Sequence, residues 1–245
     1  MSDSEEDIDI TPFFPRYLFP DGDYALDSIG LRSQLLGLTT GLSVSATAAL
    51  VVYGDYYHAT LFIFFLSVFH FLEFWITARY NTRRANLGSF LFTNGRAYNA
   101  AHTFAIAEYL LETHFFATSL HPSRPVFIFG LLLIFSGQLL RSLAMAHAAT
   151  SFNHHVAYVK EVDHRLVTSG VYRYFRHPSY LGFWMWGLGT QVMMGNPVSF
   201  VGYAVVLWRF FRGRIYYEER YLVKFFGQRY IDYRNRTWVW IPFIK

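Results

Sequence analysis

The amino-acid sequence predicts an all-α polytopic integral membrane protein with about six transmembrane segments, and three observations support this. Of the 245 residues, 53% are hydrophobic and only 16% are charged, whereas a soluble domain carries about 25% charged residues. Several weakly charged stretches approach the ~20 residues that cross a bilayer core. Lysine and arginine gather in alternate loops between these stretches, as expected for the cytosolic side of a membrane.

The chain divides near residue 30 into an acidic head and a membrane domain. Residues 1–27 hold eight of the 17 acidic residues and one of the 21 basic ones, a composition typical of a disordered segment. We therefore expect 1–30 to be a disordered cytosolic head and 31–245 to form the membrane domain. The N-terminus lacks the basic, then apolar pattern of a secretory signal, so the first membrane segment should direct insertion.

Four membrane helices are expected in the first part of the domain, 33–150. They are predicted at 33–52, 58–78, 98–118 and 125–146. The first contains Gly37, Gly41 and Ser45 at four-residue spacing, a stripe that lets helices approach closely. Packing within the monomer and a homodimer face are the two alternatives for it. The third contains Glu108 and Glu112, so it should face other helices or a wet cavity, because charge facing lipid is costly.

The second part, 151–245, is expected to hold a loop, a short helical hairpin and a C-terminal helix. The segments 178–194 and 197–211 are short for a ~30 Å core at 1.5 Å per residue, and "GNP" makes the turn between them. Beyond the hairpin, "RIYYEERYLVKFFGQRYIDYRNR" alternates aromatic and charged residues with helical spacing. This pattern predicts an amphipathic helix on the cytosolic side.

Basic residues indicate the orientation of the chain. They cluster in the loops 79–96 and 160–176 and from Arg209 onward, whereas the intervening turns hold only Arg124. The positive-inside bias then places both termini in the cytosol. Because these basic residues lie beside membrane spans, anionic lipid is their expected partner and nucleic acid is not. The chain has no cysteine, which excludes disulfides, thiolate metal sites and a cysteine nucleophile.

A candidate binding site lies where "RYFRHPSYLG", from Arg173, enters the hairpin. Pro178 suits the first position of a helix, and the exposed N–H groups of a helix start favour an anion. The hairpin topology brings this point beside Arg214 and Glu218, which are four residues apart and share one helix face. A surface ion pair is the alternative interpretation of those two. No "GxGxxG" follows a strand, so a Rossmann-type cofactor site is not indicated.

Two long stretches resemble the isoprenylcysteine carboxyl methyltransferase family. They are "LVTSGVYRYFRHPSYLGFWMWGLGTQVMMGNP" and "WRFFRGRIYYEERYLVKFFGQRYIDYRNR". "SFLFTNGRAYNAAH" and "SFNHHV" are similar to upstream patterns of that family. The resemblance covers Ser89 to Lys245, and more weakly the first two segments. The short "RHPxYxG…EE" pattern alone is less specific, because it recurs in phospholipid methyltransferases and related membrane enzymes.

The resemblance implies a multi-pass enzyme of the endoplasmic reticulum membrane. Such an enzyme uses S-adenosyl-L-methionine to methylate the C-terminal carboxylate of a farnesylated or geranylgeranylated cysteine in CaaX-processed proteins. Arg214 would bind the prenylcysteine and act in catalysis with Glu218. The sequence departs from the family pattern at Ala157, where a polar Gln is usual. The residues implied to hold the cofactor are His164, Arg165, Leu166, Val167, Tyr172, His177, Pro178, Ser179, Tyr180 and Glu218.

Other functions and roles remain open at this level. A phospholipid amine N-methyltransferase would share the cofactor, although an amine acceptor calls for an acidic partner in place of Arg214. A non-catalytic membrane binding protein with the same fold is the third alternative. Glu219 is either part of the site or a solvated neighbour of Glu218. The spacing of the potential ligands His154, His155, Asp163 and His164 matches no usual metal site, so no metal is expected.

Overall fold

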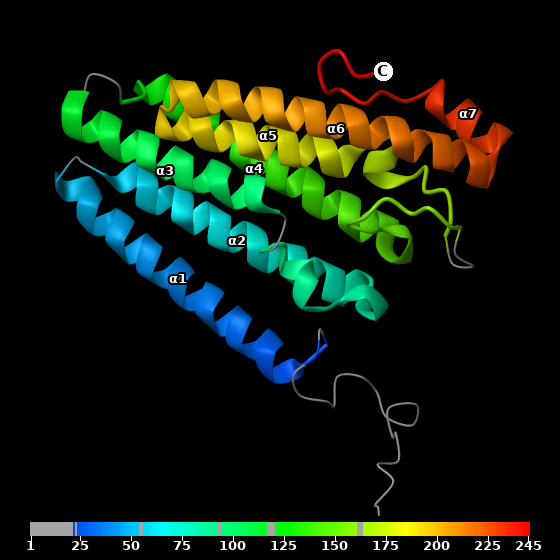
Figure 1. The fold of residues 1–245 in the computed structure, drawn as a ribbon, viewed down its shortest axis with the longest axis horizontal. Coiled ribbons are helices and arrows are strands. Elements are labelled where there is room, and N and C mark those ends of the chain that lie inside the picture. Colours follow the sequence, from blue (N-terminus) through cyan, green and yellow to red (C-terminus); the bar gives the residue numbers. More distant parts are fainter. Residues whose placement is uncertain (1–21, 23, 54–55, 93–94, 117–120, 161–163) are drawn as a thin grey trace, which may run out of the picture.

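The computed structural model describes residues 22, 24–53, 56–92, 95–116, 121–160 and 164–245, and these are almost entirely helical. The long helices lie side by side along one common direction (Figure 1). Within the described part of the chain, an isolated bridge between Phe175 and Trp238 is the sole β-type pairing, so the all-α prediction is confirmed. The helices are α1 (Leu26–Tyr53), α2 (Tyr57–Tyr80), α3 (Arg96–Phe116), α4 (Arg124–Ala148), α5 (Pro178–Met194), α6 (Pro197–Phe226) and α7 (Gln228–Arg234).

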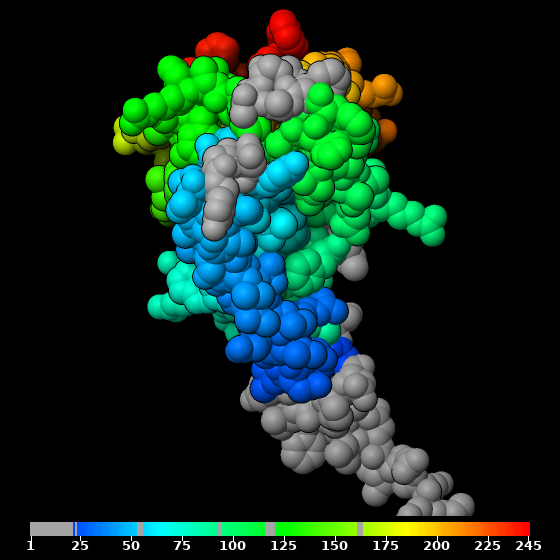
Figure 2. All heavy atoms as spheres, turned by 90° about the vertical axis from the view of Figure 1, so that its left-hand side faces the viewer, coloured from blue at the N-terminus to red at the C-terminus, as the bar shows by residue number. Residues whose placement is uncertain are grey.

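Most of the predicted acidic head, up to residue 21 and at 23, lies outside the described residues. The first helix begins at Leu26, earlier than the predicted segment 33–52. It lies at one edge of the bundle, with the C-terminal tail at the opposite edge (Figures 1 and 2). Its Gly37 and Gly41 have no heavy atom within 4 Å of where a Cβ would be, and Ser45 is exposed. The small-residue stripe therefore does not pack against the described part of this chain.

Three helical stretches are long and apolar enough to cross a membrane, judged by length and composition, in the described part of the chain. They are Leu26–Val52, Tyr57–Tyr80 and Arg124–Ser151. The other predicted segments are also helical, but α3 carries two glutamates, α5 has only 17 residues, and α6 is apolar only in its first half. The structure thus supports an all-helical membrane protein with three clear candidate spans, where the sequence predicted about six.

The second arm of the hairpin and the amphipathic helix, predicted as separate elements, form one continuous helix. Helix α6 runs for 30 residues from Pro197 to Phe226 without a break at 211. Gly213 is tolerated inside it, since one interior glycine costs only about 1 kcal/mol. Phe211 and Ile215 on either side are each 2% exposed, so burial holds this turn in the helix. The chain turns at Gly227, whose φ is 57°, and α7 follows.

Helices α4 and α5 pack backbone against backbone along four glycines. Gly130 and Gly137 on α4 are seven residues apart, as are Gly182 and Gly189 on α5. A Cβ on Gly137 would lie 2.6 Å from the carbonyl oxygen of Gly182, and one on Gly182 would lie 2.6 Å from that of Gly137. Small residues allow such close approach between membrane helices. The space beside Gly182 is therefore filled by α4.

Candidate active site

All ten residues implied to hold the cofactor line one pocket, at the end of the bundle where α5 begins. The pocket has a volume of about 110 Å³. Its walls are the segment after α4, the start of α5, the second half of α6 and α7. Nine further residues line it that the sequence patterns do not single out as cofactor ligands: Ala148, Ser151, Phe152, Asn153, Arg176, Leu222, Phe226, Tyr230 and Tyr233.

The start of α5 is fixed by a long-range contact from α4. Pro178 occupies the first helical position and His177 precedes it as the N-cap. The backbone N–H groups of Tyr180 and Leu181 each donate to the His177 carbonyl at 3.1 Å. Arg141 donates from Nη1 to the Ser179 hydroxyl at 2.9 Å. The helix terminus that faces the pocket is therefore held in place by hydrogen bonds from two directions.

Tyr180 connects Arg214 and Glu218. Arg214 Nε donates to the Tyr180 hydroxyl at 2.8 Å, and that hydroxyl donates to the Glu218 carboxylate. The Tyr180 ring stacks with His177 at 5.4 Å and with Phe211 at 5.2 Å between centroids. Arg214 and Glu218 are both half-buried, so the exposed ion-pair interpretation does not describe them. The Tyr180 hydroxyl therefore bonds to Arg214 and Glu218, while its ring packs against His177 and Phe211.

A buried ion pair that the sequence analysis did not assign lies behind the pocket. Glu73 on α2 and Arg141 on α4 are 1% and 7% exposed. Arg141 donates to both carboxylate oxygens, with 2.7 Å between Nη2 and Oε2. His154 Nε2 lies 3.0 Å from the same Oε2, and the His154 carbonyl accepts from Arg214 Nη2. Contacts thus run from the bundle interior through the 153–155 loop to Arg214.

The sequence does contain a signal for this pair. Glu73 is the only charged residue in the predicted segment 58–78, and Arg141 is the only one in 125–146. Lone opposite charges in two apolar segments are costly unless they meet. Pairing them would have predicted that α2 and α4 are neighbours.

Glu219 points away from Glu218, into a second cluster of charges. Its carboxylate lies 2.9 Å from Arg176 Nε, 3.3 Å from His177 Nε2 and 3.8 Å from Arg234 Nη1. Burial alone would raise the pKa of this carboxyl, but the hydrogen bond and charge of His177, together with Arg176, outweigh it and lower the pKa. Glu219 is therefore a paired, ionised group and not a solvated neighbour of Glu218.

The pocket also contains an unsatisfied donor. Tyr230 is 1% exposed, and its hydroxyl has no hydrogen-bond partner among the described residues. Burial, reinforced by the charge of Glu219, raises the pKa of Tyr230, so the hydroxyl stays protonated. Buried polar atoms are normally satisfied, so a ligand group is the natural partner. A carboxylate, a phenol and a helix start suit a zwitterionic, hydroxyl-bearing molecule such as S-adenosyl-L-methionine.

An apolar groove of about 330 Å³ lies between α3, α5 and α6. It ends at Phe210, whose ring centre lies 5.9 Å from the Arg214 guanidinium carbon. Phe183, which also lines it, packs against Phe211 at 6.0 Å. Arg214 is not among the described residues that line either cavity, but it contacts Phe210 of the groove and Tyr180 of the pocket, so it lies between them. The groove is lined by Ala97, Tyr98, Ala101, His102, Phe104, Phe183, Trp186, Gly187, Val198, Ser199, Gly202, Tyr203, Val206, Leu207 and Phe210.

The remaining predicted positions lie around the pocket. Ala157 is half-buried and is not among the described residues that line the pocket. His164 packs against Phe225 and Phe226, with ring centres 5.7 and 5.4 Å apart. Asp163 lies outside the described residues, and the described part of the chain contains no cluster of three or more potential metal ligands.

The fold and the site define an all-helical membrane protein with a polar pocket and an apolar groove close to each other. A family profile for isoprenylcysteine carboxyl methyltransferases matches residues 128–224. A solved structure of the eukaryotic intramembrane Ras methyltransferase ICMT is 34% identical, with a TM-score of 0.85, covering 95% of this chain and 81% of that one. This chain belongs to the isoprenylcysteine carboxyl methyltransferase family.

Curated relatives show the same similarity along most of the chain. The protein-S-isoprenylcysteine O-methyltransferase of Saccharomyces cerevisiae is 43% identical over 229 residues, which cover 89% of this chain and 92% of the relative. That of Schizosaccharomyces pombe is also 43% identical and covers 90% and 96%. The human enzyme is 39% identical and covers 89% and 75%. The similarity therefore extends well beyond the pocket.

Proposed function

We propose that this protein transfers a methyl group from S-adenosyl-L-methionine to the C-terminal carboxylate of a prenylated cysteine in CaaX-processed proteins. The observation that carries the proposal is the position of Arg214, which donates to Tyr180 of the polar pocket and lies over the ring of Phe210 of the apolar groove. A guanidinium binds a planar carboxylate in two places. An acceptor with a carboxylate beside a long apolar chain, farnesyl or geranylgeranyl, suits this junction.

The cofactor assignment rests on the pocket lining. Glu218 would accept from an amino or ribose group, Tyr230 would donate, and the α5 start would favour the methionine carboxylate. His164, Arg165, Leu166, Val167 and Tyr172 would form the opposite wall. When bound, S-adenosyl-L-methionine supplies an electrophilic methyl group on a sulfonium. The residues of this chain bind and orient the two reactants around that centre.

The proposed chemistry needs no general base. A cysteine α-carboxylate with a pKa of roughly 3.3–3.7 is already ionised near neutrality. One carboxylate oxygen bonds to the methyl carbon as the carbon–sulfur bond breaks, leaving a neutral ester and a neutral thioether. Arg214 would hold the carboxylate while Tyr180 and the His154 carbonyl fix its guanidinium. Alignment of this kind can supply up to ~7–11 kcal/mol.

The membrane topology is part of the proposal. We place the enzyme in 31–245, with four membrane helices in 33–150 and the cofactor-binding elements in 151–245. In this topology the chain crosses the membrane at α3, at α5 and at the first half of α6, in addition to the three candidate spans. The chain then crosses six times, and both termini are cytosolic. The basic loops support this orientation. The family membership supports the endoplasmic reticulum membrane as the location. We also propose that the exposed face with Gly37, Gly41 and Ser45 forms a homodimer interface.

A transfer assay tests the function. The purified chain is incubated with labelled S-adenosyl-L-methionine and either a farnesylated or geranylgeranylated cysteine or phosphatidylethanolamine. We expect base-labile methyl ester on the prenylcysteine only. Label in the phospholipid would support an amine N-methyltransferase. Cofactor binding by calorimetry without transfer to either acceptor would support a non-catalytic binding protein.

A further inference from the structure

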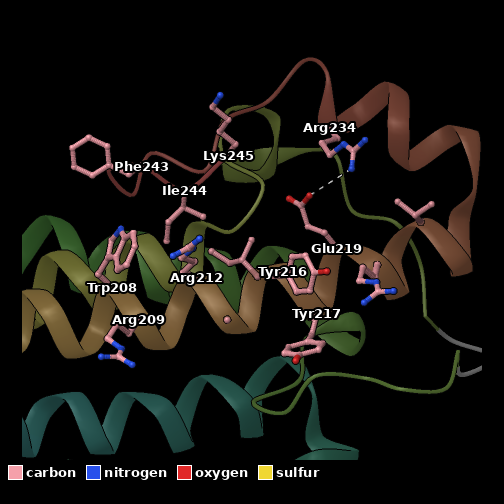
Figure 3. A pocket seen from close by; sticks show the side chains of 14 residues that line it. Trp208, Arg209, Arg212, Tyr216, Tyr217, Glu219, Arg234, Phe243, Ile244 and Lys245 are labelled. Atoms are coloured by element: carbon pink, nitrogen blue, oxygen red, sulfur yellow. Dashed lines mark ion pairs between the residues drawn. The ribbon is translucent and has the colours of Figure 1, made fainter.

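A second groove, distinct from the site described above, lies on the outer face of α6 beneath the C-terminal tail. It holds about 1120 Å³. Figure 3 shows Phe243, Ile244 and Lys245 of the tail over the α6 face that carries Trp208 and Arg212. Trp208 Nε1 donates to the Pro242 carbonyl at 2.7 Å. The tail therefore returns along α6 to the level of Trp208.

The groove is strongly basic. Of its charged lining side chains, the single carboxylate is Glu219, which already contacts Arg176, His177 and Arg234. Among the described residues, no ion pair involves Arg212, and its recorded contact is with the Trp208 ring at 5.2 Å. The groove thus carries more basic than acidic side chains. Its basic residues are Arg209, Arg212, Arg220, Arg234 and Lys245.

The tail carries two largely exposed aromatic side chains. Trp240 and Phe243 are 65% and 93% exposed, and both have φ of 63°. Bulky residues rarely adopt the left-handed region, which costs of order 1–3 kcal/mol each. Val239 and Ile241, each 2% exposed, anchor the strained segment against the core. The fold therefore keeps two large aromatic rings mostly exposed, although the Trp240 ring also meets that of Phe175 edge-on at 6.3 Å between centres.

An apolar stripe on α6 leads into the basic groove. Val201 and Val205 are 60% and 51% exposed, and their spacing places them on one face with Trp208 and Arg212. Along this face the chain presents first exposed aliphatic residues, then aromatic rings, and then cations. A bilayer has the matching order, from the hydrocarbon core through the interface to the headgroups. Basic residues at that level each attract anionic lipid by about 1 kcal/mol.

We propose that this groove binds the headgroup of an anionic phospholipid of the cytosolic leaflet. The phosphate lies at Arg212 and Lys245, an acyl chain lies along the valine stripe, and Trp240 and Phe243 insert beside it. The inference rests on the proposed topology but not on the methyl-transfer chemistry, because lipid binding requires neither donor nor acceptor. Phosphate and acidic peptides share the anionic chemistry, so the experiment includes both.

Native mass spectrometry of the full-length chain, taken from nanodiscs of phosphatidylcholine with about one fifth phosphatidylserine, measures which lipid is retained. We expect phosphatidylserine to be enriched in the wild type, and less so at high salt, since salt screens exposed charges. The double variant Arg212→Gln/Lys245→Gln should weaken phosphatidylserine binding by at least about tenfold. The variant Trp240→Ala/Phe243→Ala should lower total lipid retention while keeping the preference for phosphatidylserine.

The matched control is Arg229→Gln/Arg236→Gln, which removes two exposed basic residues outside the groove and should change binding by less than about twofold. Unchanged cofactor binding by calorimetry verifies folding of each variant. The proposal is overturned if the wild type shows no preference for phosphatidylserine, or if Arg212→Gln/Lys245→Gln and the control Arg229→Gln/Arg236→Gln lose it equally. Displacement of the lipid by inorganic phosphate or by a peptide of residues 1–21 would assign the groove to a soluble anion. The enrichment of phosphatidylserine over phosphatidylcholine on the wild type tests the proposal even if a variant does not fold.

Discussion

Glu73 of α2 and Arg141 of α4 form a two-pronged ion pair inside the helix bundle, with 2.7 Å between Arg141 Nη2 and Glu73 Oε2. Arg141 also donates to Ser179 at the start of α5. One buried arginine therefore connects the second and fourth helices to the cofactor pocket. The site depends on a contact that lies outside its own lining.

Loss of one member of this pair should be costly, because it leaves the other charge buried alone. We expect Arg141→Met to destabilise the protein by about 3–5 kcal/mol and to lower its thermal midpoint in detergent. The double variant Glu73→Leu/Arg141→Met should recover much of the loss, since it removes both charges. A single variant as stable as the wild type would show that the pair contributes nothing.

Arg214→Lys keeps the charge but loses the Nε hydrogen bond to Tyr180 and the forked geometry. We expect turnover of prenylcysteine to fall at least about tenfold, or ~1.4 kcal/mol. Cofactor affinity should stay within about twofold, because Glu218 and the α5 start are untouched. The matched control is Arg209→Lys at an exposed position on the same helix. Normal turnover in Arg214→Lys would exclude a bidentate grip.

Two neighbouring tyrosines should respond differently to loss of the hydroxyl. Tyr230→Phe removes a group without a partner among the described residues, so the thermal midpoint should not fall, while cofactor affinity should drop by about 1 kcal/mol, or roughly fivefold. Tyr233 donates to the Tyr172 carbonyl at 2.7 Å, so Tyr233→Phe should lower the midpoint. Unchanged cofactor affinity in Tyr230→Phe would mean that the ligand does not use this hydroxyl.

Glu219 predicts a pH dependence of stability. Its pKa is lower in the folded protein than the ordinary value, so its stabilising effect is present above about pH 4.3 and is lost as pH falls through the folded pKa. Glu219→Gln should therefore lower the thermal midpoint at pH 7, with a difference that shrinks in acid. Asp232→Asn, at an exposed position, is the control. A difference that persists at the lowest pH would assign the effect to packing.

The methyl-transfer step should be nearly independent of pH between about 6 and 8, because the acceptor carboxylate is ionised throughout that range. Single-turnover rates on prenylcysteine with saturating cofactor measure this step. His177 is 4% exposed and is occupied with Glu219 and the Tyr180 ring. A steep rise across the range that disappears in His177→Gln would instead indicate an essential base.

The sequence predicts the parts of the site better than the contacts between them. All ten residues that the resemblance assigned to the cofactor line one pocket, because short motifs carry such residues together. The partners of Tyr180 could not be predicted, since they depend on how α5 and α6 face each other. The continuous α6 was missed because the change from an apolar to an amphipathic pattern near residue 211 marks a change of environment and not a helix end.

The glycine contacts between α4 and α5 determine which parts of the enzyme are able to move. With Gly137 and Gly182 backbone to backbone, α5 has no room to rotate or slide against α4 without collision. We therefore expect the start of α5, with His177 to Tyr180, to stay fixed during the reaction. Displacements that admit the donor or release the product should occur in the other walls of the pocket, which are the segment after α4, the second half of α6 and α7.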